Sequence, residues 1–148
     1  MDCVQMNAST RKISICGRHT QYSLIHPDRV MNEHDLIYCI SGSWEIWQNE
    51  KQYMLHSGES LLLSAAMHHY GIQRSSADCE TIFIHFSAEE DDALDLDCCI
   101  HPTPIANQFI IPVLNHSSQS SIVYDLFCQI VDAFWSPTVY ASIEAEAY

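Results

Sequence analysis

A series of short β-prone runs, each ended by a turn signal, constrains this fold more than any other feature of the sequence. The runs cover residues 13–16, 22–25, 34–40, 43–48, 51–55, 60–63, 68–73 and 79–86. Asn49 and Glu50 separate two of them as a two-residue hairpin turn would. Gly42 and Gly58 stand where tight turns need a positive φ. Short strands with closely spaced turns predict an all-β sandwich or barrel.

The pattern becomes helical after residue 117. Apolar residues recur at three- and four-residue spacing: Ile122, Val123, Leu126, Phe127, Ile130, Val131 and Phe134. This spacing predicts an amphipathic helix that ends at Ser136 and Pro137, and Thr138 is placed to begin a second helix. Apolar surface left over on the first helix would pair two copies of the chain, most simply with twofold symmetry. The predicted dimer interface comprises Val123, Phe127, Ile130, Val131 and Phe134.

The composition narrows the function classes. Hydrophobic residues make up 47% of the 148 residues, which is typical of a globular chain. Nineteen acidic residues against six unclustered basic residues give a net charge of −13, so this chain should not bind nucleic acid by itself. Its apolar runs are far shorter than the roughly 18 residues of a membrane span. The N-terminal stretch lacks the apolar core of a signal peptide, so we expect a cytoplasmic protein without membrane partners.

The seven cysteines show neither a CxxC motif nor another metal-binding spacing. An odd number of cysteines in a chain without an export signal argues against a disulfide framework. We therefore expect buried, reduced thiols. The adjacent pair Cys98 and Cys99 is interpreted as accidental rather than as a redox switch.

The middle of the chain carries an ordered set of pieces. From residue 34 they read HDLIYCISG, SWEIWQNEKQYMLHSGESLLL and AAMHHYG, and TIFIHF follows from residue 81. In this order the pieces resemble the N-terminal effector-binding domain of AraC/XylS-type bacterial transcription regulators. The resemblance implies a mainly β fold, a cupin-type β-barrel (jelly roll) followed by C-terminal α-helices. It also implies an effector-binding barrel at 1–107 and a helical dimerisation and linker segment at 108–148, with the helix-turn-helix DNA-binding region absent from this chain.

The resemblance and the strand alternation together suggest which residues line the barrel. The effector-binding candidates are Arg29, His34, Trp44, His69, Tyr70, Thr81 and Phe83. The resemblance places His69 and Tyr70 beside the ligand. Trp44 is a candidate because it shares a strand face with Ile46, and the fork of Arg29 suits a hydroxyl or carboxylate. A small barrel encloses one small ligand, and a carbohydrate is the first candidate for this effector.

The sequence departs from the metal set of cupin enzymes, which is a His-x-His pair, a carboxylate and a later His. By resemblance Arg29 and Met31 stand at the His-x-His positions, Asp35 near the carboxylate and His69 at the final His. Arg and Met do not complete a nitrogen–oxygen metal site, so we expect no metal, no cofactor and no catalytic residue. Two alternatives stay open: a stand-alone metal-dependent cupin enzyme (an isomerase or oxygenase), and a structural dimerisation module with a filled barrel.

Overall fold

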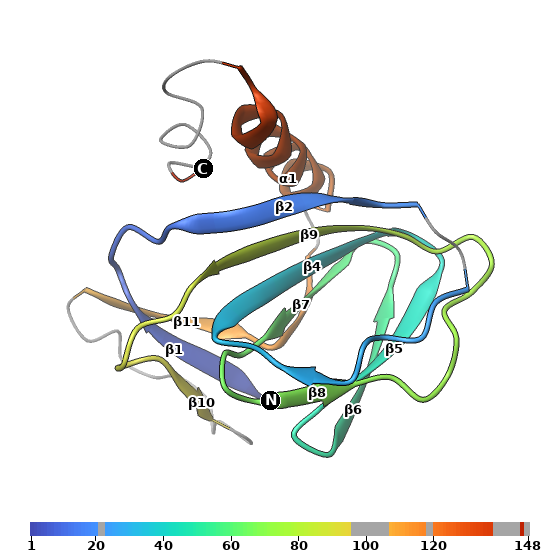
Figure 1. The fold of residues 1–148 in the computed structure, drawn as a ribbon, viewed down its shortest axis with the longest axis horizontal. Coiled ribbons are helices and arrows are strands. Elements are labelled where there is room, and N and C mark those ends of the chain that lie inside the picture. The colour runs from blue at the N-terminus through green and yellow to red at the C-terminus, as the bar shows by residue number, and fades with distance from the viewer. Residues whose placement is uncertain (21–22, 96–106, 118–119, 138–145, 147–148) are drawn as a thin grey trace.

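The computed structural model describes residues 1–20, 23–95, 107–117, 120–137 and 146 (Figure 1). In this part of the chain the strands are β1 (Cys3–Asn7), β2 (Ile13–His19), β3 (Arg29–Val30), β4 (Glu33–Ser41), β5 (Ser43–Gln48), β6 (Lys51–His56), β7 (Glu59–Leu63), β8 (His68–Tyr70), β9 (Glu80–Ser87), β10 (Ala93–Asp95), β11 (Gln108–Pro112) and β12 (Leu114–His116). One long helix, α1 (Ser120–Trp135), follows them.

The strands form three antiparallel sheets. A five-stranded sheet has the order β12-β7-β4-β9-β2, a four-stranded sheet the order β3-β8-β5-β6, and a three-stranded sheet the order β10-β1-β11. In Figure 1 β2, β9 and β4 lie on one side of the barrel, whereas β8, β5 and β6 lie on the other side. The predicted cupin-type barrel, followed by a C-terminal helix, is confirmed.

Two apolar cores lie on opposite faces of the five-stranded sheet. Successive residues of a strand point to opposite faces. Ile37 and Cys39 on β4 therefore join the core inside the barrel, while Tyr38 joins the core beneath α1. Trp44 and Ile46 on β5 also belong to the inner core, as the alternation of that strand predicted. β4 and β9 thus contribute apolar side chains to both cores.

The helix α1 covers the outer face of the five-stranded sheet (Figure 1). Phe127 is 5% exposed, and its ring lies 5.3 Å from that of Tyr38. The predicted dimer residues all lie in or against this core: Val123, Phe127, Ile130, Val131 and Phe134. The apolar residues that α1 leaves most open to solvent in its first turns are Ile122 and Leu126, 53% and 38% exposed. The dimer interface itself stays a prediction.

The segment 108–148 begins with two strands rather than with a helix. β11 pairs with β1, and β12 pairs with β7, so residues up to His116 belong to the sheets. These strands show no clear period in the sequence, because they are short and their pairing partners lie far along the chain. The division into domains at residues 107 and 108 stays a prediction. The second helix proposed from Thr138 lies outside the described residues, apart from Glu146, which is helical.

The turns of the barrel have the backbone conformations that the sequence predicted. Asn49 and Glu50 have φ of 48° and 64° between the paired strands β5 and β6. Gly42 has φ of 74°, and an added Cβ would lie 2.3 Å from Ser76 Oγ. Glycine is therefore required there for both conformation and space. None of the helices in the described residues has the length and apolarity that crossing a membrane demands.

Candidate functional site

A cavity of about 240 Å³ lies between the inner face of the five-stranded sheet and the strands β3 and β5. Its walls are mostly apolar or aromatic, with a few polar side chains. The lining residues are Ile15, His19, His26, Pro27, Arg29, Asp35, Ile37, Trp44, Thr81, Phe83 and His85. Ligand pockets typically have this mixture of apolar walls and few polar anchors. The cavity is smaller than the roughly 300–1,000 Å³ of pockets for drug-sized ligands, so it suits a small molecule.

A charged cluster forms one wall of this cavity. Asp35 Oδ2 lies 3.4 Å from Arg29 Nη2 and 3.3 Å from His85 Nε2. The side chain of Asp35 is 3% exposed. Among the described residues, Asp35 Oδ1 and Arg29 Nε are buried and have no hydrogen-bond partner. A buried polar atom without a partner costs free energy, so a group that reached this acceptor or this donor would stabilise the site.

Two buried histidines lie beside this cluster. His26 lines the cavity, and its ring lies 5.1 Å from that of His69 in an edge-to-face arrangement. Burial lowers the pKa of both imidazoles to about 4. Both rings are consequently neutral at pH 7, and they add polarity to the site without adding charge. His69 packs behind His26 and is not among the lining residues.

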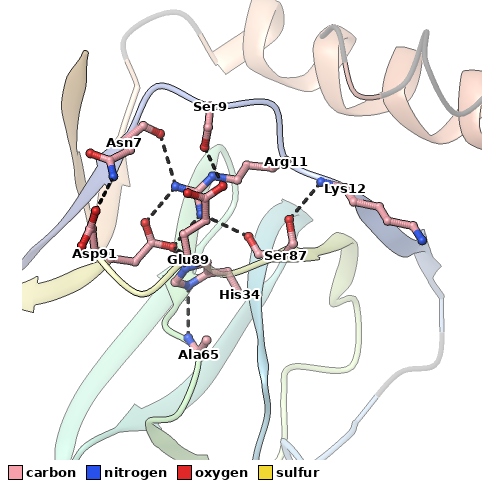
Figure 2. A network of polar contacts seen from close by, with 10 residues as sticks. Asn7, Ser9, Arg11, Lys12, His34, Ala65, Ser87, Glu89 and Asp91 are labelled. Atoms are coloured by element: carbon pink, nitrogen blue, oxygen red, sulfur yellow. Dashed lines mark hydrogen bonds and ion pairs between the residues drawn. The ribbon is translucent and has the colours of Figure 1, made fainter. Parts of the chain in front are cut away.

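His34 belongs to a different network, outside the cavity (Figure 2). Its Nδ1 accepts a hydrogen bond from the Ala65 amide at 3.1 Å, so its Nε2 carries the proton and donates to Asp92 at 2.8 Å. Asp92 also accepts hydrogen bonds from both terminal nitrogens of Arg11, at 2.6 and 2.8 Å. The network therefore joins the β1–β2 connection, β4 and two loops. His34 faces away from the effector cavity because it is adjacent to Asp35 on one strand.

Tyr70 lies on the outer face of the four-stranded sheet. Its ring stacks on that of Trp47, with centroids 5.9 Å apart and an interplanar angle of 9°. The ring of His68 stacks on Tyr70 as well. No bulge turns Tyr70 inward, so it occupies the face opposite to His69.

The structure brings together four of the seven effector candidates. Arg29, Trp44, Thr81 and Phe83 line the cavity, whereas His34, His69 and Tyr70 do not. Sequence reasoning missed several lining residues: Ile15, His19, His26, Pro27, Asp35, Ile37 and His85. Strand alternation was a usable signal for His85, which follows Thr81 and Phe83 on one face of β9. The role of every one of these residues in binding stays a prediction.

The donors around the cavity do not assemble a metal site of the cupin kind. Among the described residues, no group of three or more His, Cys, Asp or Glu side chains is arranged to hold a metal ion. Arg29 lies against Asp35, where it places a cation beside the carboxylate. A guanidinium in this position opposes a second cation, because like charges repel strongly in a partly buried site.

A barrel of three antiparallel sheets around a small, partly polar cavity defines a cupin-type binding domain. The family model of the AraC-like ligand binding domain matches residues 12–141. The chain therefore belongs to the AraC-like ligand-binding domain family, which fits the transcription-regulator resemblance of its sequence.

The individual proteins that resemble this chain match only part of it or share little sequence identity with it. The chain is 36% identical over 61 residues to the uncharacterized HTH-type transcriptional regulator YisR of Bacillus subtilis (strain 168). That match covers 41% of this chain and 21% of the relative. An RmlC-like cupin from Shewanella frigidimarina NCIMB 400 aligns with a TM-score of 0.45 and 12% identity, over 54% of this chain and 70% of that chain. Apo ToxT K231A from Vibrio cholerae strain SCE256 aligns with a TM-score of 0.49 and 8% identity. The alignment covers 95% of this chain and 53% of that chain.

Proposed function

We propose that this chain senses a small hydroxyl-bearing effector, of the carbohydrate class, for a bacterial transcription regulator. The observation that carries this proposal is the pair of buried, unpartnered atoms in the cavity wall, Arg29 Nε and Asp35 Oδ1. A hydroxyl group both donates and accepts hydrogen bonds, so neighbouring hydroxyls of a sugar satisfy this donor and this acceptor together. A simple anion would accept a hydrogen bond from Arg29, but the carboxylate of Asp35 would repel it.

The remaining wall of the cavity supports the same class of ligand. Trp44 and Phe83 present aromatic surface, which suits the apolar C–H face of a sugar ring. Trp44 is held in place because its indole Nε1 donates to the Leu24 carbonyl at 3.1 Å. The neutral imidazole of His26 adds a further hydrogen-bonding group without charge. The site is thus built from one charge pair, neutral polar groups and rings.

The DNA-binding step belongs to a part of the regulator other than the region described here. The net charge of −13 makes this chain a poor partner for a polyanion. An effector changes the output of such a regulator only if it binds one conformation more tightly than another. We propose that the chain acts in the cytoplasm, as a sensor rather than as an enzyme.

Effector binding is tested by a thermal-shift screen of the chain against sugars, small acids, amines and divalent metals. A ligand at a hundredfold excess over its dissociation constant stabilises the folded form by about 2.7 kcal/mol. We expect a neutral sugar to raise the unfolding midpoint, and Asp35→Asn to weaken its affinity at least about tenfold, since a hydrogen bond to a charged group is worth about 1.5–3 kcal/mol.

Tyr70→Phe is the matched control for this screen. It keeps the ring stacked on Trp47 on the outer face, so the affinity for the same sugar should not change. A response to divalent metals alone would contradict the proposal and favour the metal-dependent cupin enzyme. Loss of sugar binding in Tyr70→Phe would place the site on the outer face of the sheet.

We further propose that two copies of the chain pair through α1. Ile122 and Leu126 are one helical turn apart and exposed, beside the residues that pack on the barrel. Leu126→Glu should convert a dimer into a monomer without loss of fold, because it alters solvent-facing surface only. Light scattering coupled to gel filtration measures the change, with Asp125→Asn as the control on the same helix. A wild-type chain that is monomeric at high concentration contradicts this proposal.

A further inference from the structure

Two cysteines that are distant in the sequence meet inside the barrel. Cys39 lies on β4 and is 0% exposed, and Cys79 directly precedes β9 and is 4% exposed. β4 and β9 are hydrogen-bonded neighbours, in which Cys39 is opposite Thr81. The register shifts between Cys39 and Ser41, where β4 carries an extra residue. Such a bulge bends the strand locally, close to the residues that pair with the segment after Cys79.

Both cysteines lie against Gly42, which directly follows β4. Cys39 Sγ lies 3.2 Å from the Ser41 carbonyl oxygen and 3.6 Å from that of Gly42. Gly42 in turn packs on the backbone of Cys79, whose Cα would be 2.8 Å from a Cβ added to the glycine. Both side chains belong to the apolar core inside the barrel, and the thiol of Cys39 interacts with that of Cys79. The two thiols are therefore neighbours in this core.

The contact makes one of the two sulfurs nucleophilic. The hydrogen bond from Cys39 lowers the pKa of the Cys79 thiol, and a hydrogen bond with Ser75 lowers it further. The pKa of Cys39 is raised by the same interaction, so the proton stays on Cys39. By contrast, burial raises the pKa of Cys16 to about 11. Since the thiolate is the reactive form, Cys79 is the sulfur prepared to react first.

A small cavity lies beside Cys79. The thiol lines a small cavity of about 10 Å³, large enough for about one water-sized molecule. Three residues of this small cavity, His19, Trp44 and Thr81, also line the larger cavity. The small cavity beside Cys79 therefore adjoins the space in which the effector is proposed to bind, although the chemistry of Cys79 does not depend on an effector.

We propose that Cys39 and Cys79 form a redox pair that a hydroperoxide closes into a disulfide. The Cys79 thiolate attacks the peroxide, the O–O bond breaks, and a sulfenic acid and water form once a proton is taken up. Cys39 then attacks the sulfenic sulfur, the S–OH bond breaks, and a second water leaves as the S–S bond forms. Two thiols and one hydrogen peroxide give one disulfide and two waters, so the protein loses two electrons and two protons.

The test is made on the wild-type chain, reduced and then treated with one equivalent of hydrogen peroxide at low protein concentration. We expect titration of the denatured chain to show a loss of two of its seven thiols. A non-reducing peptide map by mass spectrometry should link the peptides of Cys39 and Cys79, and dithiothreitol should separate them. Retention of all seven thiols, a disulfide between other cysteines, or a linked dimer overturns the proposal.

Variants separate the roles of the two sulfurs. In Cys39→Ser, Cys79 should stop at the sulfenic acid, which a dimedone probe labels in a 1:1 ratio. Cys79→Ser should lose both the labelling and the disulfide, whereas Cys16→Ser should still form the disulfide as wild type does. Dimedone labelling of Cys79→Ser equal to that of Cys39→Ser overturns the assignment of Cys79 as the first nucleophile. If a variant fails to fold, the peptide map of the wild-type chain still decides the pairing.

Discussion

Asp92→Ala is expected to lower the free energy of unfolding by about 3–5 kcal/mol, the usual cost of removing one partner from a buried ion pair. The carboxylate of Asp92 is 3% exposed, and it holds the buried side chains of Arg11 and His34. Its removal leaves the largely buried guanidinium of Arg11 without its paired carboxylate. It also frees the Nε2 proton of His34 and the amide of Glu89, which both donate to the same oxygen.

Urea unfolding followed by circular dichroism measures this change, and Asp91→Ala is the matched control. Asp91 is the preceding acidic residue, but it is exposed and accepts a hydrogen bond from Asn7 at the surface. Asp91→Ala should alter the free energy of unfolding by less than about 1 kcal/mol. Equal losses in the two variants would show that the network in Figure 2 does not act as a buried unit.

The pH range in which Asp92 stabilises the folded state follows from its pKa. Burial by itself raises this pKa, but hydrogen bonds from Arg11, the Glu89 amide and His34 outweigh burial and lower it to about 2. Because the pKa is depressed in the folded state, the stabilisation is present above the ordinary value of 3.8 and is lost as the pH falls toward 2. The comparison of Asp92→Ala with wild type therefore belongs near pH 7.

Lowering the pH from 7 to 4.5 is expected to reduce the free energy of unfolding by about 2–5 kcal/mol. Burial lowers the pKa of His26 and His69 to about 4, from an ordinary value of 6.5. The unfolded chain therefore takes up protons on these two side chains at a pH where the folded chain does not. The stabilisation is complete above pH 6.5 and declines as the pH falls from 6.5 toward 4, which is the opposite of a histidine that gains an acidic partner.

The measurement is the free energy of unfolding at a series of pH values, for wild type and for His26→Gln. The variant should show a shallower decline between pH 6.5 and 4.5, because it lacks one of the three histidines whose pKa burial lowers, His26, His34 and His69. His56→Gln, which changes an exposed histidine, should keep the wild-type slope. A wild-type chain whose stability is constant across this range would show that the two buried imidazoles bind protons equally well in both states.

Most strands between residues 12 and 86 were predictable because they pair with a neighbour nearby in the sequence or alternate clearly. The predicted strand at 22–25 was wrong, since the described residues 23–25 are irregular, and β3 was not predicted. The hairpin of β5 and β6 is closed by Asn49 and Glu50, and Trp44 and Ile46 reach the core by alternation. β1 and β11 gave no such signal. Val4 becomes a strand residue by pairing with Leu94 on one side and Ile111 on the other, both far along the chain.

The residues of the candidate site were likewise predictable only in part. Thr81 and Phe83 were chosen by resemblance, with strand alternation placing them on one face, and they line the same cavity as Arg29 and Trp44. His69 and Tyr70 were chosen by resemblance, and the structure places one behind His26 and the other on the outer face. His26 itself lies in an irregular segment before β3, where neither period nor turn signal indicates which way a side chain points.

The sequence by itself determined the class of fold and the amphipathic helix, because these follow from periods and turn residues that neighbouring positions carry. The order of its motifs carried the resemblance to the family. Tertiary structure decided which polar groups meet. Asp35 and His34 are adjacent, yet one joins Arg29 and His85 in the cavity and the other joins Asp92 and Arg11 outside it. Likewise Cys39 and Cys79 have no spacing motif, and a bulge in β4 brings them together. Such contacts depend on strand register and sheet pairing, which are set by the packing of the whole chain.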